Sequence, residues 1–123
     1  TGEYFTANGE RVRSKSEIII ADHLRRYGVV YKYEKPLELT VHGRRVTFYP
    51  DFTDMNSRTG RIYYLEHFGM MDNEDYYNAV LRKLDAFEMN QLLIGRDVLL
   101  LHESSSAPLN TRVLDCYIQE YLV

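Results

Sequence analysis

The sequence predicts an α/β fold in which helices flank a mixed β-sheet. The first reason is the order of the predicted elements, which runs helix, three strands, helix, strand and a last helix. The second reason is how they connect. Short turns join the three consecutive strands, which favours antiparallel pairing, whereas a strand reached through a helix favours a parallel position. The third reason is size, because 123 residues with 45% hydrophobic content fit one domain spanning 1–123.

The helices are predicted from their end signals and their apolar periodicity, and they cover 14–27, 74–90 and 111–122. Gly28 is typical of the position just after a helix. Asn110 or Thr111 can cap the C-terminal helix, because both side chains accept hydrogen bonds from free backbone N–H groups. The residues before the first helix, 1–13, are expected to form a lead-in segment with a turn at Asn8-Gly9.

The strands are predicted from apolar and aromatic runs bounded by turn residues, and they cover 29–40, 45–53, 61–68 and 97–102. The first of them is expected to be bent or interrupted at Pro36, which cannot donate to a sheet ladder. His42-Gly43 marks the turn into the second strand, and 56–60 forms a loop by composition.

Composition limits the classes of function. Cys116 is the single cysteine, so no internal disulfide can form, and a cytoplasmic location is expected. No run approaches the ~20 apolar residues that cross a bilayer, so no membrane contact is expected. The net charge of −3 argues against unspecific nucleic-acid binding, although basic residues cluster locally. Acidic residues gathered around a metal would explain this balance, and so would a solvated mixed surface.

Two acidic residues near strand ends are the first chemical signal. Asp51 follows Pro50 in the second predicted strand, and Glu66 lies in the third, between Tyr64 and Phe68 on the same strand face. Carboxylates on adjacent strands can converge and hold Mg²⁺ or Mn²⁺, which activates water for phosphodiester hydrolysis. Alternatively, Asp51 is a polar strand end and Glu66 an exposed strand residue. The backbone carbonyl of His67 is a further candidate ligand.

Glu17 is a candidate on the first helix. On a helical wheel it lies in line with Leu24 (about 20° away) rather than opposite the apolar stripe. The alternative is a capping box, because Ser14-Lys15-Ser16-Glu17 matches S-x-x-E, in which Glu17 bonds back to the backbone of Ser14.

Lys83 is the candidate amine. It lies about 60° from Val80 on the wheel, at the border of the apolar face of the second helix. A lysine there either extends outward to solvent or points its ammonium into the carboxylates, where it can orient water and stabilise developing phosphate charge.

With these residues in place, the sequence resembles the PD-(D/E)XK nuclease superfamily, and more closely a bacterial group within it. The segments that carry the resemblance lie within 11–103: VRSKSE, YKYEKPLEL, FYPDF, YYLEHFGMMD and YYNAVLRKLDAF. The resemblance implies a restriction-endonuclease-like αβββαβ core. The family pattern places lysine two residues after Glu66, where this chain has Phe68. In some branches that lysine has moved to the following helix, and Lys83 occupies such a position.

The resemblance implies metal-dependent cleavage of DNA, with RNA as an open alternative. Asp51, Glu66 and the carbonyl of His67 would hold the metal, and Glu17 would bind or tune it. Lys83 would position the attacking water. A homodimer, or attachment to a helicase-like partner, is a further expectation.

Arg13 and Lys15 are expected near the phosphate backbone on grounds of charge. The competing hypothesis is a degenerate nuclease fold that binds nucleic acid or protein without cutting.

Overall fold

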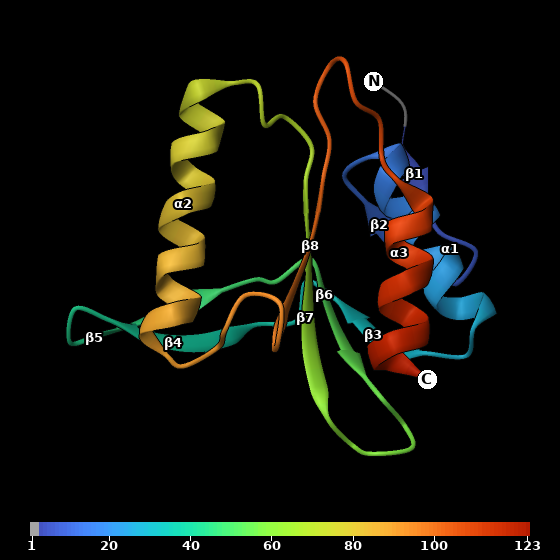
Figure 1. The fold of residues 1–123 in the computed structure, drawn as a ribbon, viewed down its shortest axis with the longest axis horizontal. Helices are drawn as coiled ribbons and strands as arrows, with labels where there is room; N and C mark the ends of the chain where they lie inside the picture. The colour runs from blue at the N-terminus through green and yellow to red at the C-terminus, as the bar shows by residue number, and fades with distance from the viewer. Residues whose placement is uncertain (1–2) are drawn as a thin grey trace.

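The computed structural model describes residues 3–123 and contains a mixed four-stranded sheet at its centre (Figure 1). Its strands are β3 (Val30–Tyr33), β6 (Phe52–Met55), β7 (Ile62–Phe68) and β8 (Val98–His102), in that spatial order. The first three pair antiparallel, and β8 joins β7 in parallel. The predicted α/β class and the mixed sheet are therefore confirmed.

Helices cover both faces of this sheet. On one side lie α1 (Lys15–Arg26) and α3 (Thr111–Tyr117), with α3 continued by the π-helical turn η1 (Ile118–Leu122). On the other side stands α2 (Glu74–Met89) (Figure 1). The helix bounds agree with the sequence prediction to within two residues. In the described part of the chain, no helix combines the length and the apolar character needed to cross a membrane.

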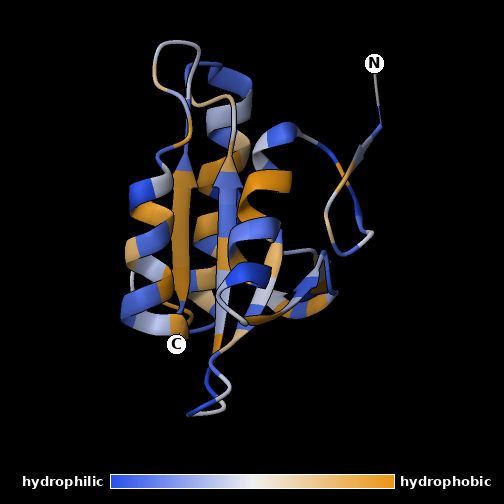
Figure 2. Ribbon diagram, turned by 90° about the vertical axis from the view of Figure 1, so that its right-hand side faces the viewer, coloured by the Kyte–Doolittle hydropathy of each residue, from blue (hydrophilic) through white to orange (hydrophobic). Residues whose placement is uncertain are grey.

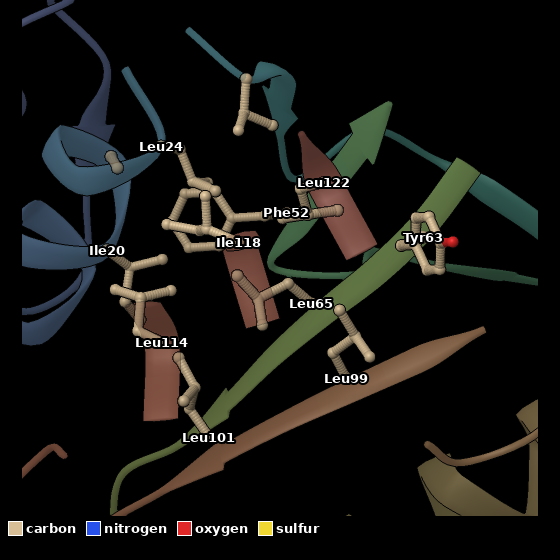
Figure 3. Packing of buried hydrophobic residues seen from close by; sticks show 12 residues of the cluster. Ile20, Leu24, Phe52, Tyr63, Leu65, Leu99, Leu101, Leu114, Ile118 and Leu122 are labelled. Carbon is tan, nitrogen blue, oxygen red and sulfur yellow. The ribbon is translucent and has the colours of Figure 1, made fainter. Parts of the chain in front are cut away.

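The main core lies between the sheet and the pair α1 and α3. Apolar residues gather along the central strands and on the helix sides that face them (Figure 2). Ile20 and Leu24 of α1 meet Leu114 of α3 over the sheet residues Phe52 and Leu65 (Figure 3). All five side chains are fully buried. Each such side chain stabilises the fold by about 1.5–3 kcal/mol through removal from water.

The expected interruption of the first predicted strand at Pro36 is confirmed, whereas the prediction of one continuous strand over 45–53 is wrong. The predicted strand 29–40 divides into β3 and β4 (Leu37–Val41), and 45–53 divides into β5 (Arg44–Phe48) and β6. The four strands form one broken hairpin. Tyr33 pairs with Phe52 and Leu37 with Phe48, so a single register continues across an unpaired gap at 34–36 and 49–51.

The gap coincides with two prolines, which explains the break. Pro36 and Pro50 lie on opposite arms of the hairpin within the gap, and neither has an N–H to donate to the ladder. Glu34, at the start of the gap, adopts a positive φ of 50°. Beyond the gap the β4–β5 arm leaves the central sheet and runs beneath α2 (Figure 1). There Leu39 joins Phe87 of α2 in a second small core.

The lead-in segment is a small hairpin in its described part. Strands β1 (Tyr4–Phe5) and β2 (Arg11–Val12) pair antiparallel around the predicted turn, where Gly9 has φ 94°. Residues 1–2 of the predicted 1–13 segment lie outside the described residues.

Asp54 is an exception within the core. It lies on β6 between Tyr31 and Tyr63 of the neighbouring strands, its exposed fraction is 0%, and neither carboxylate oxygen accepts a hydrogen bond from residues 3–123. Burial raises the pKa of Asp54 well above its ordinary value, because a charge without a partner is unstable in an apolar interior.

This burial predicts a pH-dependent gain of stability for Asp54→Asn. The folded state holds a proton that the unfolded chain releases near pH 4, so wild-type stability falls with rising pH above that value, by up to about 1.4 kcal/mol per pH unit from this group. We expect the free energy of unfolding of Asp54→Asn to exceed that of the wild type increasingly from pH 5 to pH 8, measured by urea denaturation. An advantage that shrinks with rising pH would show that Asp54 is charged and paired in the folded state.

Candidate active site

The register of β6 and β7 brings Asp51 and Glu66 together. Phe52 pairs with Leu65, so continuing the ladder by one step sets Asp51 opposite Glu66. Directly opposed residues of antiparallel strands have Cβ atoms about 5 Å apart on the same face. The backbone N–H of Asp51 donates to Oε2 of Glu66 at 3.0 Å. This bond fixes the Glu66 carboxylate against the backbone of Asp51.

His67 completes this junction through its backbone. Its N–H donates to Oδ2 of Asp51 at 2.7 Å, in place of the ladder bond that would otherwise face Pro50. The N–H and C=O of one strand residue point toward the same neighbouring strand, so the carbonyl of His67 also faces the Asp51 side. The His67 ring leaves the opposite sheet face, because side chains alternate along a strand, and its Nε2 lies 3.1 Å from Oε1 of Glu103.

Lys83 reaches the carboxylates from α2. Its ammonium contacts Oε1 of Glu66 and lies 3.4 Å from the carbonyl oxygen of Tyr49, beside the gap in the hairpin. The side chain is 23% exposed, so it points into the site rather than outward to solvent. Of the two orientations that the helical wheel left open, the structure has the inward one.

Burial dominates the electrostatics of the acidic pair. Glu66 is fully buried, and this burial together with the charge of Asp51 raises its pKa to about 7, against the opposing effect of Lys83. Burial also raises the pKa of Asp51, while Lys83 and the His67 N–H oppose the rise. Two like charges and one cation thus share a poorly hydrated space, and a second cation would stabilise both carboxylates.

Glu17 is held apart from this pair in the structure. Its N–H donates to the Ser14 hydroxyl at 3.2 Å, as the capping box predicts. The return bond differs from the prediction, because the Glu17 carboxylate accepts from the backbone N–H of Arg13 at 2.8 Å, not from that of Ser14. The same oxygen accepts from the Tyr33 hydroxyl at 3.2 Å. Burial, and to a smaller extent the charge of Asp51, raises the pKa of Glu17, so the helix acid lies within electrostatic range of the strand acids.

The two basic residues predicted to contact phosphate lie at the start of α1. Arg13 is largely exposed, and its Nε donates to Oε2 of Glu34 at 2.8 Å. Glu34 in turn bonds through its backbone N–H to the carbonyl of Asp51 at 3.0 Å, so Arg13 stands beside the hairpin gap. Lys15 is exposed.

A pocket of about 200 Å³ opens beside the cluster and is lined by Asp51, His67, Phe68, Tyr76, Ala79, Val80 and Lys83. Phe68, which stands where the family pattern has lysine, forms part of its apolar wall. Tyr76 also lines the pocket, and no functional role was predicted for it from the sequence. Its spacing of seven residues from Lys83 was the available signal, because residues two turns apart share a helix face.

The donor set suits a hard cation only in part. Within residues 3–123, no three His, Cys, Asp or Glu side chains converge as a metal cluster. Two strand carboxylates and a backbone carbonyl are nevertheless oxygen ligands of the kind that Mg²⁺ takes while keeping several waters. Oε1 of Glu66 is buried and accepts no hydrogen bond of good geometry from these residues, although Lys83 touches it. This buried oxygen is where the residues fit a metal best.

Comparisons with known proteins place the chain in no characterised family. No family model matches it, and no solved structure matches it. It is similar to the uncharacterized protein MJ1519 of Methanocaldococcus jannaschii, with 29% identity over an alignment of 126 positions. The alignment covers 92% of this chain. The chain spans about a tenth of the length of that relative. The name of that relative states no activity.

The buried contact between Lys83 and Glu66 predicts a pH-dependent loss of stability for Lys83→Met. Without the ammonium, the pKa of Glu66 rises further and the buried carboxyl stays protonated at pH 8, so we expect a loss about 1.4 kcal/mol larger at pH 8 than at pH 5, the equivalent of one pH unit above the wild-type pKa. Below the folded-state pKa of Glu66, which is about 7 with Lys83 present, the carboxyl takes up a proton and needs no partner. The loss should therefore be small at pH 5.

Urea denaturation of the single and double variants at both pH values provides the measurement. The double variant Lys83→Met, Glu66→Gln should recover most of the stability at pH 8, because it leaves no carboxyl that must stay protonated. Arg82→Met is the matched control, since Arg82 is the exposed neighbour of Lys83 on the same helix. Equal losses at pH 5 and pH 8 would contradict a buried ion pair.

Proposed function

We propose that this domain is a metal-dependent nuclease of the PD-(D/E)XK type that hydrolyses phosphodiester bonds in DNA. The observation that carries the proposal is the meeting of Asp51, just before β6, and Lys83, on α2, at the buried carboxylate of Glu66 on β7. The element order α1, β3, β6, β7, α2, β8 supports it, because it follows the αβββαβ order of that fold, with β4–β5 as an extension of the first hairpin.

The carboxylates of Asp51 and Glu66 would hold Mg²⁺ or Mn²⁺, together with the carbonyl of His67 and with Glu17 contributing from α1. Such an ion supplies Lewis-acid stabilisation of phosphate charge and lowers the pKa of bound water. The chain's own groups do the rest. The His67 N–H keeps Oδ2 of Asp51 oriented, and the Asp51 N–H keeps Oε2 of Glu66 oriented.

Lys83 would act on the reacting groups. Its ammonium lies at the mouth of the pocket on the Glu66 carboxylate, where it can hold a water by hydrogen bonding and stabilise negative charge that develops on the phosphate. A cation in a water-poor site is more effective than in bulk water, because the local dielectric constant is lower. Lys83 would thus take the role of the lysine that the family pattern places two residues after Glu66, where this chain has Phe68.

Arg13 and Lys15 would contact the phosphate backbone on the α1 side of the site. Arg13 is exposed and exchanges its partner Glu34 for phosphate at small cost, since surface ion pairs contribute little to stability. RNA remains an alternative substrate, and a homodimer or a helicase-like partner remains a proposal.

Charge-removing substitutions test the proposal. We expect Asp51→Asn and Glu66→Gln to lower metal-dependent cleavage of plasmid and single-stranded DNA by at least about 100-fold, the upper end of what loss of an outer-shell partner costs. These variants retain an oxygen for the His67 and Asp51 N–H groups, so the fold should persist. Asp75→Asn, an exposed acid in the first turn of α2, is the matched control. Cleavage unchanged in both site variants would rule out this site.

The competing function is a binding module that retains the fold without cutting. The contact of Lys83 with Oε1 of Glu66 favours it, because the amine occupies the oxygen that a metal would take. Titration calorimetry with Mn²⁺ separates the two functions. Heat of binding in the wild type that is absent in Asp51→Asn supports the nuclease, whereas no heat at millimolar Mn²⁺ together with DNA binding supports the module.

A further inference from the structure

Tyr76 is a polar group in the pocket that the proposed roles leave unused. It lies in the first turn of α2, and its ring lines the pocket together with Asp51 and Lys83. Its hydroxyl oxygen accepts a hydrogen bond from the backbone N–H of Gly69 at 2.9 Å, so the phenol is fixed at the end of β7.

The hydrogen-bond inventory of this phenol is incomplete. A tyrosine hydroxyl has one O–H donor besides its acceptor lone pairs. Gly69 uses an acceptor site, and the O–H of Tyr76 donates to no group among residues 3–123. Burial, with a smaller effect from the charge of Asp51, raises the pKa of Tyr76, so the phenol keeps its proton at neutral pH. The pocket therefore contains a fixed, protonated donor without an acceptor.

The helix directs this donor and Lys83 to the same space. The two residues are seven positions apart, which is two turns of helix, and both side chains line the pocket. Their Cα atoms are separated by about 10 Å along the helix axis. Asp51 also lines the pocket, and Lys83 contacts the Glu66 carboxylate, so a phosphate held at the two acids would enter the space that both donors line.

We infer that Tyr76 is a further catalytic residue, whose hydroxyl donates a hydrogen bond to a non-bridging oxygen of the scissile phosphodiester. The inference rests on the proposed function. Negative charge increases on these oxygens during phosphodiester hydrolysis, so the bond strengthens in the transition state. No covalent bond to tyrosine forms, and the proton stays on the phenol.

The experiment compares three variants with the wild type in steady-state cleavage of a labelled oligonucleotide with Mg²⁺. Binding of the same oligonucleotide is measured by fluorescence anisotropy with Ca²⁺ in place of Mg²⁺. Tyr76→Phe removes the hydroxyl. Tyr77→Phe removes the hydroxyl of the exposed neighbour and is the matched control. Asn73→Ala removes the side-chain cap of α2, which loosens the same helix start and leaves the phenol intact.

We expect Tyr76→Phe to lower kcat about 100-fold with KM changed less than about threefold, as for loss of one transition-state hydrogen-bond donor. Tyr77→Phe should stay within about twofold of the wild type. Asn73→Ala should show a lower Tm and retain most of its kcat. Equal kcat in Tyr76→Phe and Tyr77→Phe would overturn the inference. A loss in Asn73→Ala as large as that in Tyr76→Phe would also overturn it, because order of the helix start would then be the cause.

The wild-type measurements distinguish failure of this inference from failure of the proposed function. A wild type that cleaves, with a kcat shared by Tyr76→Phe and Tyr77→Phe, overturns the Tyr76 inference and leaves the nuclease proposal standing. A wild type that binds the oligonucleotide without cleaving it, or that does neither, contradicts the nuclease proposal and with it the catalytic role of Tyr76.

Discussion

The interruption of the long hairpin at Pro36 and Pro50 is the constraint on which the candidate site depends. Without it, Asp51 would be an ordinary ladder residue with its backbone engaged by neighbouring strands. With it, the N–H of Asp51 is available to the Glu66 carboxylate, and the Asp51 carboxylate takes the N–H of His67. The same interruption turns β4–β5 beneath α2, where Leu39 and Phe87 pack together. Positioning of α2, and with it of Lys83 and Tyr76, therefore depends on this break.

Holding the two acids Asp51 and Glu66 close together lowers the folding stability of the domain. Glu66 and Asp51 are both removed from water, and one lysine provides the local positive charge. Asp54, in β6, is another fully buried carboxyl, and it has no hydrogen-bond partner among residues 3–123. Lost stability at a functional site is common where a domain must hold like charges close together. Asp54 belongs to the opposite sheet face, and the structure gives no chemical role for it.

Much of the architecture followed from local signals in the sequence. Two helix starts were predictable because Ser14 and Asn110 precede apolar periodic segments, and the structure confirms both caps by their side-chain hydrogen bonds. The helical wheel placed Lys83 at the border of the apolar face, because that geometry is local, but it left the direction of the side chain open. An interruption at Pro36 was among the expectations, but the break at Pro50 was missed. A proline marks a weak point in a strand, but only the pairing of the two arms shows that the two weak points coincide.

The acids of the site were predicted from the sequence, but the prediction of its polar contacts was incomplete. Asp51 and Glu66 were identifiable because adjacent strands bring their carboxylates to one face. The hydrogen bond from the Arg13 N–H to the Glu17 carboxylate could not be predicted, because the S-x-x-E pattern does not fix which backbone N–H the glutamate reaches. The place of Tyr76 in the pocket depends on how α2 docks on β7, a tertiary fact that helical periodicity alone leaves open.

The central claim is that Asp51 and Glu66 together hold a divalent cation, and anomalous scattering from Mn²⁺-soaked crystals tests it most directly. The account predicts a manganese peak in contact with both carboxylates in the wild type and no peak at that position in Asp51→Asn crystals. Wild-type crystals soaked in millimolar Mn²⁺ that show Lys83 still seated on Glu66, and no anomalous density between the two acids, would contradict it.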